Sequence, residues 1–203
     1  MGFLSPSGSV TRYKVKGELA APVLETAARA LAKHAIEEEP SVPEKKVVGW
    51  TSFENPYQAD FSGSSFAFDP YLLFAMRVDK KTLPAKLVKK EVARFTARRL
   101  AAGDREFLSR EQKKEVRAEA EDYLLARIPA VPHVFDVLWN YEAGDLWLFS
   151  TQKAACEDLQ TLFYATFGLV AVPMVPFTKA EACGLSPAEV DALSKAAPAS
   201  FAE

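Results

Sequence analysis

Hydrophobic and polar residues alternate in some segments of the chain and recur with helical spacing in others. Alternation or a short apolar run predicts strands at 9–16, 47–53, 71–78, 133–141, 146–150 and 169–177. A spacing of three or four residues predicts helices at 22–36, from 84 to the break at 103–104, from 109 through 124, at 153–167 and at 186–195. Two prolines interrupt the strand at 169–177 and place it at a sheet edge.

The order of these elements predicts the architecture. Runs of strands followed by a run of helices favour an α+β fold rather than a parallel α/β fold. We therefore predict a single domain, 1–203, made of two similar halves of antiparallel sheet with flanking helices. The halves span about 9–79 and 129–178, a helical hairpin at 80–128 lies between them, and a tail follows at 179–203.

Several helix ends carry their own signals. Ser109 and Gln112 have the spacing of a capping box, and Ser186 precedes the last helix in a similar context. Thr151 is predicted to cap the helix at 153–167. Gly168 is predicted to end that helix in the left-handed conformation, which glycine adopts most easily.

Charge is distributed unevenly. Residues 80–117 hold thirteen Lys and Arg against five Asp and Glu, a net charge of +8. The whole chain holds 25 basic and 27 acidic residues, so the remainder carries twelve against 22, or −10. A near-neutral chain with one concentrated basic block favours a polyanionic partner.

The basic block has helical periodicity. Lys86, Lys90, Arg94 and Arg98 follow one another at intervals of four, which places them along one ridge of a helix. Val88, Val92 and Phe95 fall on roughly the opposite face, where we expect them to pack on a core. The alternative is a solvated helix pair that binds nothing.

Known catalytic motifs are missing from the sequence. It has two histidines, two widely spaced cysteines, no phosphate-binding glycine loop and no GxSxG or HExxH motif, so we predict no enzyme, no metal site and no cofactor. Five aspartates are the candidate magnesium ligands of a nuclease: Asp60, Asp69, Asp79, Asp136 and Asp145. Reduced cysteines and the lack of a long apolar run predict a cytoplasmic protein that does not enter a membrane. The tryptophans in predicted strands are expected in the core.

A set of short motifs resembles the RdgC family, recombination-associated proteins that also carry an exonuclease label. The matching segments are 12–15, 49–50, 80–84, 109–114, 124–127, Trp139, 150–159, 167–168 and 172–176. One departure is at 125–129, Leu-Ala-Arg-Ile-Pro, where family members carry Leu-Pro-Arg-Ala-Phe. Family members are also longer, so the resemblance is to a short form that lacks their C-terminal third.

The resemblance implies a dimer that closes into a ring, binds duplex DNA without sequence preference and opposes recombinase filaments. We therefore predict a nucleoid-associated DNA-binding homodimer that modulates recombination. The predicted contacts are Lys86, Lys89, Lys90, Arg94, Arg98, Arg99, Arg110, Lys113, Lys114, Arg117 and, from its motif position, Arg127. The alternatives are a metal-dependent nuclease and a module that docks an acidic protein.

Overall fold

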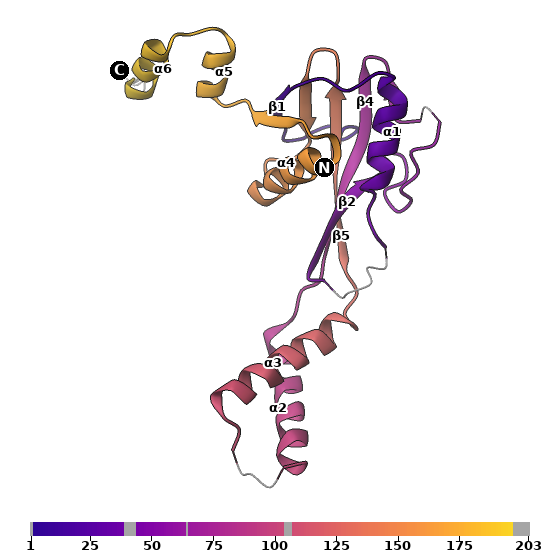
Figure 1. Cartoon of the computed structure of the whole chain (residues 1–203), viewed down its shortest axis with the longest axis vertical. Coiled ribbons are helices and arrows are strands. Elements are labelled where there is room, and N and C mark those ends of the chain that lie inside the picture. Colours follow the sequence, from indigo (N-terminus) through magenta and orange to yellow (C-terminus); the bar gives the residue numbers. More distant parts are fainter. Residues whose placement is uncertain (1, 39–43, 64, 104–106, 197–203) are drawn as a thin grey trace. The chain divides into compact units, whose positions relative to one another are not determined.

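A computed structural model describes residues 2–38, 44–63, 65–103 and 107–196 of the chain (Figure 1). The chain divides into two compact units. The sheet unit comprises Met1–Ala35, Trp50–Met76 and Phe135–Glu203, and the hairpin unit comprises Ile36–Gly49 and Arg77–Val134. No helix among the described residues is long and apolar enough to cross a membrane.

The predicted α+β class is confirmed, since helices accompany an antiparallel sheet. The strands are β1 (Thr11–Lys16), β2 (Lys46–Thr51), β3 (Ala67–Phe68), β4 (Tyr71–Lys80), β5 (Val131–Asn140), β6 (Asp145–Leu148) and β7 (Val170–Pro173). The helices are α1 (Val23–Lys33), α2 (Ala85–Ala101), α3 (Arg110–Leu125), α4 (Lys153–Phe167), α5 (Pro176–Ala182) and α6 (Pro187–Lys195).

The strand order does not separate into two similar halves. It is β2-β4-β5-β6-β1-β7, with β3 paired to β4. Strand β1, from the first predicted half, lies between β6 and β7 from the second, and pairs antiparallel with both. Long-range pairing of this kind depends on residues far apart in the chain, which periodicity cannot identify. Strand β7 ends the order, so its predicted place at the sheet edge is confirmed.

The core of the sheet unit is rich in aromatic side chains. Trp139 packs against Phe163 and Phe167 of α4, with ring centroids 5.0 and 5.1 Å apart. Trp50 packs edge-on against Phe74 at 5.0 Å and donates its indole N–H to Thr166 Oγ1 at 2.7 Å. Both tryptophans are buried, as the sequence predicted for strand positions, whereas Trp147 of β6, for which the same was predicted, is only half-buried. Helices α1 and α4 contact each other over this core.

Helix α4 and its surroundings show where local signals succeeded and failed. The bounds of α4 agree with prediction, and Gly168 ends it with φ of 68°. The N-cap residue is Gln152 rather than Thr151, and no side chain caps the helix; the Ser150 hydroxyl accepts a hydrogen bond from the Gln152 backbone N–H at 3.1 Å. The predicted strand at 169–177 is also too long. Pro176 starts α5, and the Thr178 hydroxyl accepts a hydrogen bond from the Val175 backbone N–H at 2.9 Å.

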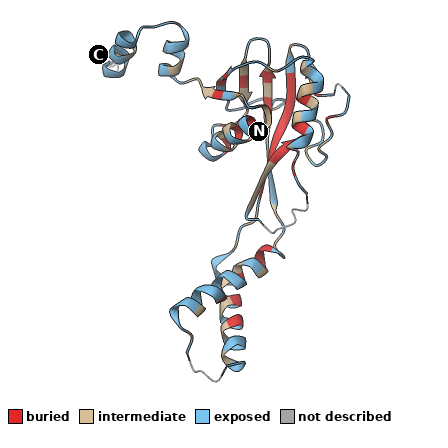
Figure 2. Cartoon of the chain, in the orientation of Figure 1, coloured by how far each residue is buried: buried red, intermediate tan, exposed pale blue. Residues whose placement is uncertain are grey.

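The hairpin unit contains the predicted pair of helices. The capping box of α3 is present. The backbone N–H of Gln112 donates to Ser109 Oγ at 3.2 Å, and the backbone N–H of Ser109 donates to the side-chain oxygen of Gln112 at 3.0 Å. Helices α2 and α3 pack through a small cluster, the hairpin core. Its members are Phe95, Val116 and Ala120, with Val92, Leu108 and Tyr123 packed against them. Figure 2 shows few buried positions on α2 and α3.

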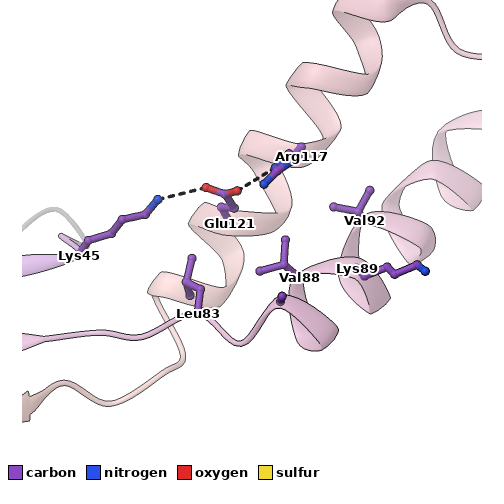
Figure 3. A pocket seen from close by; sticks show the side chains of 8 residues that line it. Lys45, Leu83, Val88, Lys89, Val92, Arg117 and Glu121 are labelled. Carbon is purple, nitrogen blue, oxygen red and sulfur yellow. Dashed lines mark hydrogen bonds and ion pairs between the residues drawn. The ribbon is translucent and has the colours of Figure 1, made fainter.

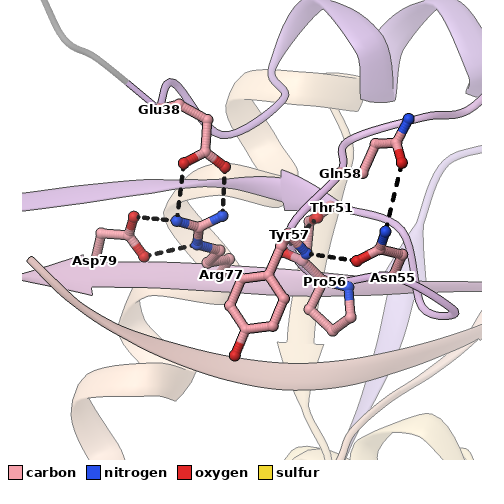
Figure 4. A network of polar contacts seen from close by, with 8 residues as sticks. All are labelled: Glu38, Thr51, Asn55, Pro56, Tyr57, Gln58, Arg77 and Asp79. Carbon is pink, nitrogen blue, oxygen red and sulfur yellow. Dashed lines mark hydrogen bonds and ion pairs between the residues drawn. The ribbon is translucent and has the colours of Figure 1, made fainter.

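A buried ionic cluster forms the other interior of the hairpin unit (Figure 4). The guanidinium of Arg77 donates to both carboxylate oxygens of Asp79, at 2.8 and 2.7 Å, and also to Glu38. Arg77 and Asp79 are both buried, whereas the Glu38 side chain is 57% exposed. The hydrogen bonds to Asp79, and then those to Glu38, raise the pKa of Arg77, although burial opposes them. This arginine therefore stays charged as an internal structural element.

Candidate nucleic-acid interface

All eleven predicted DNA-contacting cations are exposed. Six belong to α2, four belong to α3, and Arg127 lies two residues after the end of α3. On α2 the buried positions are Glu91 and Phe95. The ridge of Lys86, Lys90, Arg94 and Arg98 lies outside this buried stripe, as its spacing predicted.

The opposite face of α2 differs from prediction in two respects. Val88 lies outside the hairpin core and is only half-buried. Glu91, counted in the sequence as one of the few acids diluting the block, is instead buried, with its carboxylate 2.9 Å from the Arg94 guanidinium. Side chains three residues apart on a helix are neighbours. The buried Glu91 carboxylate therefore holds the Arg94 guanidinium against the helix surface.

Two of the predicted DNA-contacting arginines lie against the same aromatic ring. The Arg127 guanidinium lies 3.6 Å from the centroid of Tyr123, and that of Arg94 lies 4.8 Å from it. Arg127 also donates to the Tyr123 carbonyl at 3.3 Å. Cations over aromatic faces are held by the ring quadrupole. Arg94 and Arg127 therefore contribute to the packing of the hairpin unit.

Two further arginines are ion-paired. Arg99 pairs with Glu115 across the helices at 2.9 Å, and Arg117 pairs with Glu121 at 3.1 Å. The remaining predicted contacts form no ion pair with any residue that the structure describes. They are Lys86, Lys89, Lys90, Arg98, Arg110, Lys113 and Lys114.

Helix α3 carries its cations and most of its acids on different faces, although Glu121 lies on the basic face and pairs with Arg117. Arg110, Lys113, Lys114 and Arg117 occupy positions i, i+3, i+4 and i+7, so they share one face. Four acids follow a second stripe at Glu111, Glu115, Glu119 and Asp122. Only the basic face suits a polyanion. Extending the charge count beyond Arg117 would have revealed the acidic stripe from sequence.

The structure brings Lys89 of α2 and Arg117 of α3 together around one cavity of about 470 Å³, the hairpin cavity (Figure 3). Lys45 joins them from the segment before β2, and its ammonium lies 3.2 Å from Glu121. Hydrogen bonds from Arg117, and then from Lys45, lower the pKa of the Glu121 carboxyl. Lys45 was missed because it lies outside the basic block, and no sequence signal links it to α2 and α3.

The five aspartates considered as magnesium ligands of a nuclease each form a hydrogen bond or an ion pair with another group. Their partners are Arg77 for Asp79 (2.7 Å), Lys14 for Asp145 (3.1 Å), the Phe3 amide for Asp136 (2.7 Å), the Ser62 amide for Asp60 (2.8 Å) and the Tyr141 hydroxyl for Asp69. The hydrogen bond to Asp69 raises the pKa of Tyr141 to about 12. Across the described ranges, no group of three or more His, Cys, Asp and Glu side chains is placed to hold a metal ion.

Comparison with known protein families identifies a match. A protein-family model described as "Putative exonuclease, RdgC" matches residues 9–186 of the 203-residue chain. No curated protein matches the chain. The match covers the sheet strands, both helices of the hairpin and α4.

Proposed function

The chain belongs to the RdgC family, and from this membership we propose that it binds duplex DNA without sequence preference and modulates recombination. The observation that carries the proposal is the set of exposed cations on α2 and α3 that lack intramolecular ion pairs among the described residues. Three of the four ridge residues belong to this set: Lys86, Lys90 and Arg98. On α3 it includes Arg110, Lys113 and Lys114.

Phosphate neutralisation explains how such a surface binds. Each Lys or Arg that meets a phosphate releases condensed counterions, which gives affinity without a sequence code. From Lys86 to Arg98 the ridge extends over about 18 Å at the helical rise per residue. Cations that already have partners, such as Arg94 and Arg127, contribute less because DNA must compete for them.

The helices offer little for reading adenine. Adenine is commonly read by Asn or Gln, and α2 contains neither. Gln112 is the one such residue in α3, and its side chain is occupied by the capping box. The Lys and Arg side chains of these helices can contact guanine as well as phosphates, so competition between unrelated duplexes tests the proposed lack of preference, and we expect affinity to change by less than about tenfold.

The proposal includes a homodimer and association with the nucleoid, both of which the family resemblance implies. It treats the protein as a DNA-binding protein rather than an enzyme, although the family description mentions an exonuclease. A metal-dependent nuclease predicts degradation of labelled duplex DNA with Mg²⁺ or Mn²⁺. Degradation that co-purifies with the protein and is lost in an Asp136→Asn or Asp60→Asn variant would favour the nuclease instead.

A salt series tests the proposal directly. Duplex binding should weaken linearly with the logarithm of salt concentration, and replacing Lys86, Lys90, Arg94 and Arg98 by Gln should reduce that slope by about two to four units. The structure favours the lower part of this range because Arg94 is already paired.

The matched control removes the same charge from the sheet unit. Arg29, Lys33, Lys153 and Lys195 are exposed, and their replacement by Gln should leave the slope unchanged. An unchanged slope in the ridge variant, with normal circular dichroism, would show that the ridge is only a solvated face.

A further inference from the structure

The hairpin cavity has walls of two kinds. Leu83, Val88 and Val92 supply apolar surface, and Lys45, Lys89 and Arg117 also line it, with the Lys89 ammonium directed away from Glu121 (Figure 3). Its volume of about 470 Å³ falls within the range of ligand-binding pockets. A surface that contacts only phosphates has no use for an apolar floor, because phosphate recognition is electrostatic.

The lining favours an anion. It contains three cations and one carboxylate, Glu121, so its formal charge is +2. Glu121 lies between the Lys45 ammonium at 3.2 Å and the Arg117 guanidinium at 3.1 Å, which orients both cations. Lys89 is exposed and forms no ion pair within the described parts of the chain. It is the cation most available to a ligand.

The apolar walls also discriminate between anions. Single-stranded nucleic acids bind through bases stacked on aromatic rings, and the cavity has no aromatic lining residue among those described. Branched aliphatic side chains instead suit a bulky apolar side chain. Acidic residues beside that side chain would meet the surrounding cations.

We propose that the hairpin cavity docks a short acidic peptide segment of a partner protein. One bulky apolar side chain of the peptide enters between Leu83, Val88 and Val92, and neighbouring carboxylates pair with Lys89 and Arg117. This inference goes beyond DNA binding. Lys89 and Arg117 are also predicted DNA contacts, whereas the apolar walls Leu83, Val88 and Val92 belong to the cavity alone, so the peptide tests do not depend on DNA binding.

Fluorescence anisotropy with a labelled synthetic peptide, in which aspartates flank a single phenylalanine, tests the peptide side of the proposal. We expect saturable binding to the full chain, weakened at least about tenfold when the phenylalanine becomes serine. A similar loss is expected when the aspartates become asparagines. Equal binding of the parent and serine peptides would overturn the proposal, because an apolar anchor would then have no role.

Substitutions in the protein test the location. Lys89→Glu should weaken peptide binding at least about tenfold, whereas Lys90→Glu, a matched change at the next residue outside the cavity, should weaken it by less than about threefold. Val88→Asn should also weaken it by about tenfold while duplex DNA affinity stays unchanged, and Leu83→Ser repeats this test outside the helix. Circular dichroism confirms that each variant is folded.

Three other outcomes would overturn the proposal. Equal loss for Lys89→Glu and Lys90→Glu would indicate general charge attraction. Single-stranded DNA that displaces the peptide from the parent protein, and that no longer binds Val88→Asn, would assign the cavity to nucleic acid. A change of oligomeric state in Val88→Asn by light scattering, without an effect on the peptide, would assign it to a second copy. None of these results depends on duplex binding, so failure of this proposal is distinguishable from failure of the proposed function.

Discussion

The sheet unit and the hairpin unit are stabilised and charged in different ways. The sheet unit buries Trp50, Trp139, Phe74 and Phe163 in one aromatic core, whereas the hairpin core is built around Phe95. The sheet unit contains eight Lys and Arg against fourteen acids, and the hairpin unit seventeen against thirteen. Burial of apolar surface increases the free energy of unfolding, and an excess of positive charge attracts anionic ligands. The comparison therefore assigns most packing energy to one unit and the positive surface to the other.

The largest expected effect comes from the aromatic core. Phe163→Ala removes a fully buried ring that contacts Trp139 and Phe167, and should lower the free energy of unfolding by about 4 kcal/mol. Phe95→Ala should lower it by about 2–3 kcal/mol, because the smaller cluster relaxes toward solvent. Urea unfolding followed by circular dichroism measures both.

The control for this comparison is Tyr164→Ala. Tyr164 neighbours Phe163 on α4 but is 61% exposed, so its replacement should change stability by less than about 0.5 kcal/mol. If Phe95→Ala lowers the free energy of unfolding as much as Phe163→Ala does, the two cores contribute equally to stability, and the proposed difference between the units is wrong.

The ionic cluster of the hairpin unit provides the next test. Asp79→Asn removes the buried carboxylate beside Arg77 and should cost about 2–3 kcal/mol, since a buried charge then loses its main partner. Glu38→Gln changes the exposed partner of the same guanidinium and should cost less than about 1 kcal/mol. Equal losses in urea unfolding would show that burial does not govern this cluster.

A smaller effect is expected at the start of α3. Ser109→Ala removes the capping hydroxyl and should destabilise the hairpin unit by about 1 kcal/mol, detected as faster amide hydrogen exchange in α3. Ser186 has the same capping box at the start of α6 in the sheet unit. Ser186→Ala should therefore leave exchange in α3 unchanged, and a shared response would argue against separate units.

The smallest effect concerns Asp136 and depends on pH. Burial raises the pKa of its carboxyl, and the hydrogen bond from the Phe3 amide only partly opposes this. A raised folded-state pKa stabilises the fold below the unfolded pKa, and that contribution is lost as pH rises through the folded pKa. Asp136→Asn should therefore be more stable than the parent at neutral pH by less than about 1 kcal/mol.

Thermal unfolding at several pH values checks this prediction. The advantage of Asp136→Asn should shrink as the pH falls through the raised folded-state pKa, and it should be absent below the ordinary aspartate range, where the parent side chain is neutral in both states. A variant that is less stable than the parent at neutral pH would show that the Phe3 hydrogen bond needs the charged carboxylate.

Local patterns predicted the features that depend on near neighbours. The capping box at Ser109, the bounds of α4 and its end at Gly168 all follow from residues within one or two helical turns. The exposed ridge on α2 has the same origin, because helical spacing decides which side chains share a face. The start of α4 after Gln152, without a side-chain cap, was not predicted, since only the backbone path decides which residue takes the N-cap position.

Features that join distant segments were decided only by tertiary structure. The place of β1 between β6 and β7 depends on pairing across more than a hundred residues. Burial of Glu91 depends on how α2 packs against α3, and the hairpin cavity depends on Lys45 reaching Glu121. Sequence by itself therefore determined the fold class, five of the six described helices and which cations lie exposed, because these follow from local periodicity. Tertiary structure decided which cations remain unpaired and which surround the cavity, because a partner distant in sequence can be identified only after the chain has folded.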